Sequence, residues 1–280
     1  MQKGFFQKYG VSVDVSFAQS SAGLATLTSG QAQFNLSDGV LAAQAAAVNT
    51  PVKVLAYFDR ISPYMVVGQA DIKQPQDLKG KTVAVSKLGD TSDVSLHIAL
   101  KPSGLNPTTD MTVLQIGNSP ARWAAMTSKQ VQGAILDTDA YTDQAKQAGM
   151  NILVSLKAQN VPYVASALMA TDDFLTANPN TAEAVLRGLI DGTKFAADDA
   201  NKTEVLADMA KELKLSPGDA QLQAAYDAYH ARSAGDPSPD PAGINTILGA
   251  LKDIDPNQYG KVTADQILDP SIMARIKANP

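Results

Sequence analysis

Apolar and polar positions divide the first 155 residues into a repeating series of strand, polar loop and helix. Compact apolar runs, several of them β-branched, predict strands at 11–15, 34–36, 51–57, 64–68, 82–86, 111–116, 131–136 and 151–155. Most of these runs lead into a loop with Ser, Asp or Gly and then into helical apolar spacing. A repeat of this kind predicts an α/β protein whose sheets are flanked by helices.

The stretch 75–97 shows the repeat most clearly. Residues 75–81 have the pattern of a short capped turn, and residues 82–86 that of a buried parallel strand. Residues 89–92 (Gly-Asp-Thr-Ser) then offer flexible backbone and N-cap candidates before an apolar helical segment. A similar helix start is predicted at Ser119, with Pro120 in the first helical position. Small ligands bind at the carboxyl ends of the strands in open α/β sheets, so these loops are expected to face a ligand.

The second half of the chain has a different pattern. Residues 163–171 form an extended apolar segment, which we expect to return the chain from a second lobe to a first and to pair with 64–68. Helical spacing dominates afterwards, at 180–197, 203–213, 217–233 and 241–253. These patterns predict two lobes, the first made of residues 1–70 and 166–280 and the second of residues 71–165.

Composition narrows the classes of function. Charged residues make up 18% of the 280 residues and the formal net charge is -5, which argues against nucleic acid or an anionic membrane as partner. The absence of cysteine excludes disulfides, thiol catalysis and Cys-based metal sites. His97 and His230 lack metal-ligand spacing, and no Gly-x-Ser-x-Gly motif occurs. No apolar run is long enough to span a membrane, and the polar start of the chain does not resemble a signal peptide.

The candidate ligand residues lie mainly in loops that follow predicted strands. They are Ser20, Ser21, Ser37, Asp38, Asp59, Arg60, Gly89, Asp90, Thr91, Ser92, Ser119 and Asp137. Their hydroxyls, together with helix N-terminal amides, would bind an anionic or strongly polar group. The alternative is that the Ser, Thr and Asp residues are helix N-caps without a ligand.

Two cations and two aromatic residues complete the candidate set. Arg60 and Arg122 would hold a sulfonate or carboxylate in bidentate fashion, unless they are surface residues. Tyr163 and Tyr64 stand at the presumed lobe crossings, where they would stack on a flat ligand or pack a hinge. Trp123 is expected in the core. The carboxylates of Asp38, Asp90 and Asp137 favour a zwitterion or a polar organic molecule over nitrate.

Several stretches in order resemble one family. They are residues 3–11 (Lys-Gly-Phe-Phe-Gln-Lys-Tyr-Gly-Val), 27–31 (Leu-Thr-Ser-Gly-Gln), 77–85 (Asp-Leu-Lys-Gly-Lys-Thr-Val-Ala-Val), 89–92 and 126–136. Over residues 3–190 the chain is similar to solute-binding proteins of ABC importers of the nitrate/sulfonate/taurine type, which are related to pyrimidine-precursor synthase-like proteins of thiamine metabolism. The family normally has a strand and most of a helix before residue 3, Gly at the position of Lys129 and an acidic residue at that of Gln132.

The resemblance implies a two-lobed periplasmic-binding-protein fold of type II, with a mixed sheet flanked by helices in each lobe and the ligand in the cleft between them. It further implies a monomeric, non-enzymatic receptor without cofactor or metal, periplasmic or membrane-anchored outside the cell, that closes on a small polar organic ligand and delivers it to a membrane permease. The candidate ligands are a sulfonate, a taurine-like compound, an aromatic carboxylate or a pyrimidine.

Two other functions remain open at this stage. A pyrimidine-precursor synthase-like enzyme on the same fold would need an active-site lysine and histidine, for which only Lys87 and His97 are available. The cysteine-rich motif of that branch is absent. A sensor domain on the same fold would be supported by a fused membrane or signalling segment, and none is recognisable in this sequence.

Overall fold

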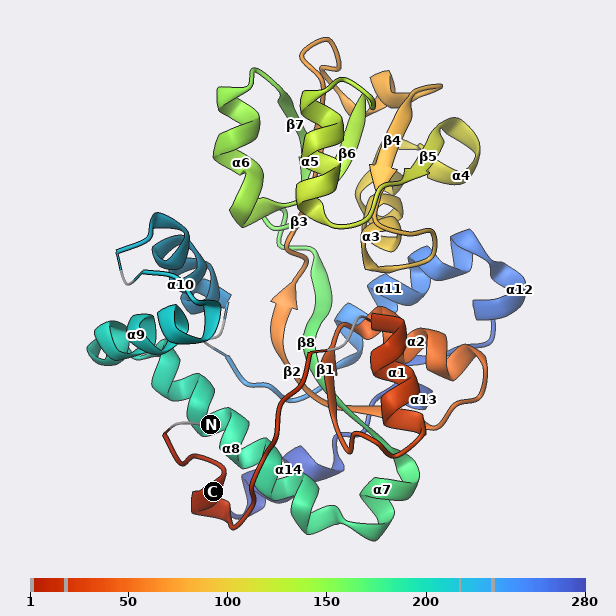
Figure 1. The fold of residues 1–280 in the computed structure, drawn as a ribbon. Coiled ribbons are helices and arrows are strands. Elements are labelled where there is room, and N and C mark those ends of the chain that lie inside the picture. The colour runs from red at the N-terminus through yellow and green to blue at the C-terminus, as the bar shows by residue number, and fades with distance from the viewer. Residues whose placement is uncertain (1–2, 18–19, 217, 233–234) are drawn as a thin grey trace. The chain divides into compact units, whose positions relative to one another are not determined.

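The computed structural model describes residues 3–17, 20–216, 218–232 and 235–280. The chain forms two compact units. The first unit comprises Met1–Arg60, Ala165–Pro241 and Ala264–Pro280, and the second comprises Ile61–Val164 and Ala242–Thr263. Figure 1 follows the chain through both by colour. None of the helices in these described ranges is long and apolar enough to cross a membrane.

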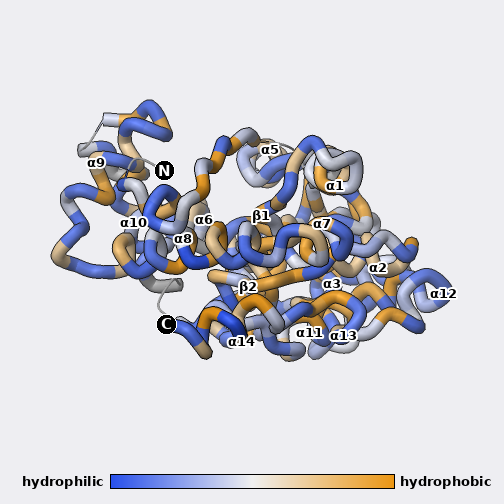
Figure 2. Tube along the Cα trace, turned by 90° about the horizontal axis from the view of Figure 1, so that it is seen from below, coloured by the Kyte–Doolittle hydropathy of each residue, from blue (hydrophilic) through white to orange (hydrophobic). Residues whose placement is uncertain are grey.

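In its described residues, the first unit contains three strands and several helices. Its strands are β1 (Asn35–Ser37), β2 (Val52–Ile61) and β8 (Pro162–Thr171). Its helices are η1 (Gln7–Tyr9), α1 (Ser20–Thr28), α2 (Gly39–Ala47), α7 (Asp172–Ala177), α8 (Pro179–Ala197), η4 (Asp199–Asn201), α9 (Lys202–Leu213), α10 (Ala220–Arg232), α13 (Ala264–Ile267) and α14 (Ser271–Ala278). The strand order is β1-β8-β2, with β1 antiparallel to β8. Figure 2 shows β2 as hydrophobic over much of its length.

The core of this unit joins the sheet to α8. Leu55, Leu168 and Leu186 belong to one buried apolar cluster, into which Phe6 also packs. The strand predicted at 11–15 is not formed, although Val11 and Val13 pack against this cluster. A strand requires a neighbour for its backbone N–H and C=O groups, and no described strand pairs with this segment. Alternation of apolar residues therefore produced packing without a strand.

The second unit contains a five-stranded sheet. Its strands are β3 (Tyr64–Gly68), β4 (Thr82–Val85), β5 (Thr112–Gln115), β6 (Gly133–Asp137) and β7 (Asn151–Ser155). Its helices are η2 (Pro75–Leu78), α3 (Thr91–Leu100), η3 (Lys101–Ser103), α4 (Pro107–Asp110), α5 (Ser119–Thr127), α6 (Thr138–Gln147), α11 (Pro241–Ile254) and α12 (Pro256–Tyr259). The strand order is β5-β4-β6-β3-β7. β4 is parallel to β5 and β6, whereas β3 is antiparallel to β6 and β7.

The partners of β8 and β3 differ from the prediction. β8 was expected to pair with 64–68, but it pairs with β1 and β2, and β3 lies between β6 and β7. Residues 64–68 therefore lie in the second unit rather than in the predicted first lobe. The physical reason is burial on both sides, because Val66 packs in one core of the second unit and Met65 and Val67 in the other.

Helix α11 also lies in the second unit, although the lobe prediction put its residues in the first. Gly243 allows it to approach Tyr163 of the same unit closely, since an added Cβ would lie 2.5 Å from the Tyr163 carbonyl carbon. The close approach depends on the absence of a side chain at residue 243. Helical spacing in the sequence does not reveal such a contact.

The two faces of the second sheet pack against different helices. Val83, Val85 and Ile135 share a buried cluster with α3 residues such as Leu96 and Leu100. The alternate strand residues Ala84, Ala134 and Leu136 share another with Met126 of α5 and Ala145 of α6. Figure 1 shows α5 and α6 side by side on their face of the sheet. Apolar residues on both faces explain the continuous apolar runs of these strands.

Gly188 of α8 provides a first test of this packing. A Cβ at Gly188 would lie 2.5 Å from Cδ1 and 3.2 Å from Cα of Phe6. We expect Gly188→Ala to destabilise the first unit by about 1–3 kcal/mol, because Phe6 and its backbone would have to move. Gly192→Ala is the matched control, since its Cβ would meet Phe5 at an ordinary 3.5 Å. Urea unfolding of both variants measures the difference, and equal midpoints would contradict the packing described.

Lys129 provides a second test. It follows α5 with φ 59°, in the left-handed region that favours glycine, and its N–H donates to the Met126 carbonyl at 3.0 Å. We expect Lys129→Gly to stabilise the protein by about 1 kcal/mol, because the Cβ strain at this C-terminal turn is removed. Thermal unfolding measures the change, with Lys146→Gly inside α6 as a control that must destabilise.

Candidate functional site

The parallel strands of the second unit bring several candidate residues to one edge of the sheet. β4 lies between β5 and β6 and is parallel to both, so the carboxyl ends of all three strands share this edge. β4 and β5 each lead there into a loop and then into a helix, α3 and α5 respectively, whereas β6 runs directly into α6. Gly89, Asp90, Thr91, Ser92 and Asp137 therefore lie along this edge, as the sequence pattern predicts.

The loop between β4 and α3 is a closed network of hydrogen bonds. Asp90 is the N-cap of α3 and accepts from the backbone N–H of Ser92 at 3.1 Å and of Asp93 at 3.4 Å. The hydroxyls of Ser86 and Ser92 both donate to the Asp90 carboxylate. Gly89 adopts φ 78°, which turns its N–H toward Asp93 at 2.8 Å. The N-cap interpretation of Asp90 is confirmed, and a role in ligand binding stays a prediction.

Asp93 is a residue of this site that sequence reasoning missed. Its side chain is 3% exposed, and one carboxylate oxygen has no hydrogen-bond partner among the described residues. Burial raises the pKa of Asp93, and the nearby charge of Asp90 adds to the rise. Its position three residues after an N-cap is the available signal, because an acidic side chain there returns to the start of the helix.

The side chain of Arg122 is buried at the same edge of the sheet rather than exposed on the protein surface. It is 2% exposed, and its Nε donates to the Ile135 carbonyl at 2.7 Å. One terminal nitrogen donates to the Gly117 carbonyl and the other to the Ser119 hydroxyl at 2.8 Å. The helix start also differs from the prediction, because Asn118 caps α5 by accepting from Ala121 N–H at 3.1 Å. Ser119 is free of the capping task and holds Arg122.

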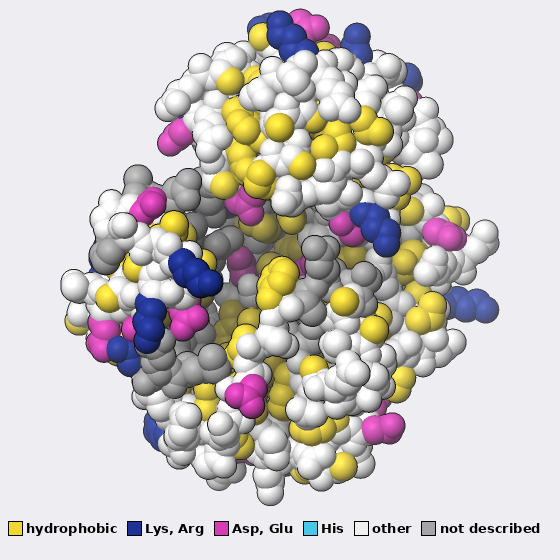
Figure 3. Space-filling model, viewed as in Figure 1, with side chains coloured by type: hydrophobic (Ala, Val, Ile, Leu, Met, Phe, Trp, Pro, Cys, Tyr) yellow, Lys and Arg dark blue, Asp and Glu magenta, His cyan; other side chains and the backbone are white. Residues whose placement is uncertain are grey.

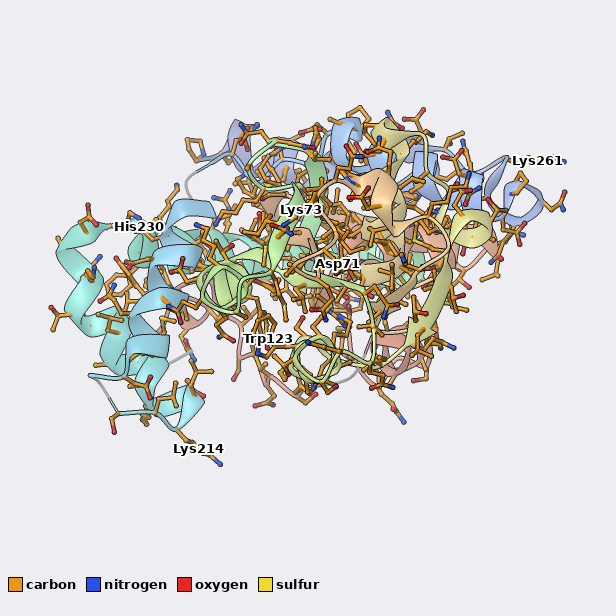
Figure 4. All side chains as sticks on the ribbon, turned by 90° about the horizontal axis from the view of Figure 1, so that it is seen from above. Asp71, Lys73, Trp123, Lys214, His230 and Lys261 are labelled. Carbon is orange, nitrogen blue, oxygen red and sulfur yellow. The ribbon has the colours of Figure 1, made fainter. Side chains whose placement is uncertain are left out.

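Aromatic side chains stand around this arginine. Tyr64 is the register partner of Asp137 across β3 and β6. Trp123 contacts Tyr141 of α6, with ring centroids 5.6 Å apart, and Figure 4 shows it between α5 and α6. Trp123 is partly buried against the core of that face, which agrees with the expectation of a core residue. Trp123 lies one turn into α5, so its fluorescence should respond to structural changes at this edge of the sheet.

The first unit carries a second group of candidates at the starts of α1 and α2. Ser37 ends β1, and Asp38 is the N-cap of α2, accepting from Val40 N–H at 2.9 Å. The predicted cap at Asp38 is therefore confirmed. Ser20 and Ser21 begin α1, but their side chains lie outside the described part of the structure.

Arg60 is engaged by its own chain. Its guanidinium pairs with the Asp240 carboxylate and donates to the carbonyls of Asp236 and Ser238 and, at 3.0 Å, to the Tyr57 hydroxyl. Burial together with Asp240 raises the pKa of Tyr57 to about 12. We interpret Arg60 as a clamp that fastens residues 236–240 to β2. The other candidate on this strand, Asp59, is buried at 7% exposure.

Tyr163 and His97 are buried rather than presented to a ligand. Tyr163 is 1% exposed and packs against Gly243, which favours the packing alternative for this residue. His97 is 6% exposed in the last turn of α3, and burial lowers its pKa to about 4, with Asp253 opposing the shift. No group of three His, Cys, Asp or Glu side chains among the described residues is placed to hold a metal ion.

Each unit has a hollow of ligand size within its own surface. In the second unit, a hollow of about 640 Å³ lies between α6 and the end of β7, with Thr142, Ile152 and Ser155 in its lining. Since β7 is antiparallel to β3, Ser155 lies at the same edge as Asp137. In the first unit, Phe58, Ile190 and Lys194 line a hollow of about 400 Å³ beside β2.

The comparisons with known proteins identify the family. The family described as NMT1/THI5 like matches residues 1–203, and the chain belongs to this family. The predicted family relationship is therefore confirmed. No curated protein sequence matches the chain.

Solved structures confirm the periplasmic-binding-protein fold. A putative periplasmic sulfonate-binding protein from Methylobacillus flagellatus shares 20% identity over 98% of this chain and 86% of its own, with a TM-score of 0.73. The aliphatic sulphonate-binding protein SsuA from Escherichia coli shares 21% over 96% and 86%, with a TM-score of 0.72. The nitrate-binding protein NrtA from Synechocystis PCC 6803 shares 14% over 99% and 84%, also with a TM-score of 0.72.

The buried histidine generates a prediction for acid stability. The pKa of His97 is lowered from 6.5 to about 4 in the folded state. Between these two pH values His97 is therefore protonated in the unfolded chain and neutral in the folded chain. Stability from this residue is present above pH 6.5 and is lost as the pH falls toward 4, by up to about 3 kcal/mol.

We expect His97→Gln to flatten the decline of stability between pH 6.5 and 4. Urea unfolding of the wild type and of His97→Gln, side by side at a series of pH values, measures it. An unchanged slope in His97→Gln would contradict the assignment.

Proposed function

We propose that this protein is an extracytoplasmic solute-binding receptor of an ABC importer. It would capture a small polar organic molecule by hinge closure and deliver it to a membrane permease. The observation that carries the proposal is the shared carboxyl edge of β4, β5 and β6, where two loops and three helix starts converge. In α/β sheets this edge is the usual place of a ligand.

The first unit supports the proposal with its own polar helix starts. Ser37 and Asp38 stand between β1 and α2, and α1 begins with two serines. The chain changes units after residues 60, 164, 241 and 263, which gives four connections about which a hinge would bend. A ligand that contacts both units would favour a closed conformation by its additional contacts in that state. The fold relatives named above bind sulfonate or nitrate, which suggests where to begin the search for a ligand.

The receptor proposal is favoured over a pyrimidine-precursor synthase. Such an enzyme would need an active-site histidine, and His97 lies buried near the C-terminal end of α3. The helix rises about 9 Å from Thr91 to His97, so the backbone of His97 lies about that far along α3 from the helix start at the ligand edge. We therefore propose a monomeric, non-enzymatic receptor that needs no cofactor and has no nucleic-acid partner.

On the face shown in Figure 3, Lys and Arg side chains are interspersed with Asp and Glu rather than gathered into a basic patch.

A ligand screen tests this function. The panel contains alkanesulfonates, taurine, nitrate, aromatic carboxylates, formyl-aminopyrimidines and pyridoxal phosphate, each scored by thermal shift and by Trp123 fluorescence. Trp123 is the sequence's single tryptophan, so its emission reports on the second unit alone. We expect one chemical class to stabilise the protein by about 2.7 kcal/mol at 100 times its dissociation constant.

Two further readouts complete the screen. Trp123→Phe is the control that must abolish the emission change while leaving the thermal shift in place. Mass spectrometry must recover the ligand unchanged. Chemical turnover, or an imine absorbance with pyridoxal phosphate, would contradict the receptor and favour the enzyme.

A further inference from the structure

Arg122 is a buried cation at the carboxyl edge of the second unit's sheet, and its hydrogen bonds go to oxygen atoms of the protein itself. Its guanidinium donates to the carbonyl oxygens of Ile135 and Gly117 and to the Ser119 hydroxyl. A planar guanidinium holds several oxygens in fixed directions, which a lysine ammonium does not. The oxygen atoms in question belong to three different segments at the end of the sheet, namely β6, the loop after β5 and the first residue of α5.

These contacts continue into the loop of the central strand. Gly117, which Arg122 holds through its carbonyl, donates its N–H to the Ser86 carbonyl at 3.1 Å. Ser86 donates its own N–H to the Ser92 hydroxyl at 2.8 Å and its hydroxyl to Asp90. One chain of hydrogen bonds thus runs from Arg122 through Gly117 and Ser86 to the start of α3.

Charge supports the same arrangement. Burial lowers the pKa of Arg122, whereas Tyr64, Asp90, Tyr141 and Asp137 act in the opposite direction. The positive charge of Arg122 therefore interacts favourably with the carboxylates of Asp90 and Asp137 at this edge. A guanidinium that is 2% exposed and donates to two carbonyl oxygens and one hydroxyl oxygen faces the protein interior rather than a ligand anion.

We propose that Arg122 is the positioning residue of the ligand edge: it fixes the loops after β4 and β5 and the start of α5 without touching the ligand. The proposal rests on the proposed function for the meaning of the edge, but its geometric part can be tested without a ligand. Sequence reasoning placed Arg122 among candidate anion clamps, and the structure assigns it to the interior of the site instead.

Hydrogen–deuterium exchange on the whole protein tests the geometric part. Arg122→Lys keeps the charge and removes the fork, and we expect it to raise exchange at residues 86–92 and 116–119 by about tenfold or more. Exchange in α11, which belongs to the same unit, should stay near the wild-type rate. Arg187→Lys in the first unit is the matched control, because Arg187 is 15% exposed and is held by Glu183. Unchanged exchange at both loops, or an equal rise throughout the second unit, would overturn the proposal.

Binding gives the second arm of the experiment. For the member of the screened panel that gives the largest thermal shift, we expect Arg122→Lys to weaken binding by about tenfold or more, while Arg187→Lys leaves it unchanged. Arg122→Met should weaken binding at least as much, because it removes the charge as well. Wild-type affinity in Arg122→Lys would overturn the positioning role. If no compound in the panel binds the wild-type protein, the proposed function fails, and the exchange measurement still decides the role of Arg122.

Discussion

The parallel pairing of β4 with both β5 and β6 is the constraint on which the rest of the second unit depends. Val83 is the register partner of Val113 on one side and of Gly133 on the other, so three carboxyl ends are aligned at one edge. Gly133 permits this alignment, because an added Cβ would lie 2.9 Å from Cδ2 of Leu78 and 3.4 Å from the Val67 carbonyl. The polar loops meet only because the sheet is packed this closely beneath them.

Several charged groups near the candidate sites make hydrogen bonds that stabilise the fold. Asp38 and Asp90 cap helices, Arg60 fastens a loop to β2, and Arg122 braces the ends of the strands. A carboxylate cap also opposes the positive field of its helix N-terminus, which weakens the attraction of that helix start for a bare anion. In a chain with 18% charged residues, such groups are few, and their structural use limits what remains for recognition.

The similarity to sulfonate- and nitrate-binding proteins is a similarity of fold. Identities of 14–21% accompany TM-scores of 0.72–0.73, which means that the fold is shared while most side chains differ. Recognition in this architecture depends on a few loop residues at the edges of the sheets. The fold therefore indicates where a ligand binds more firmly than it indicates which ligand.

Local features of the chain were predictable from the sequence alone. The strand at 151–155, the buried strand that begins at residue 82, and the caps Asp38 and Asp90 are all found where the pattern placed them. Their cause is local, since alternation, β-branching and capping act within a few residues. The family, and with it the periplasmic-binding-protein fold, was also predictable from short motifs spread over residues 3–136.

The tertiary structure decided what depends on distant partners. Residues 11–15 have the alternation of a strand but pair with no described strand, and β8 pairs with β1 and β2 rather than with β3. Helix α11 lies in the second unit, where Gly243 meets Tyr163. The burial of Arg122 belongs to the same group, because it depends on Gly117 and Ile135 meeting at the sheet edge. Pairing and burial are properties of segments far apart in sequence, so no local pattern contains them.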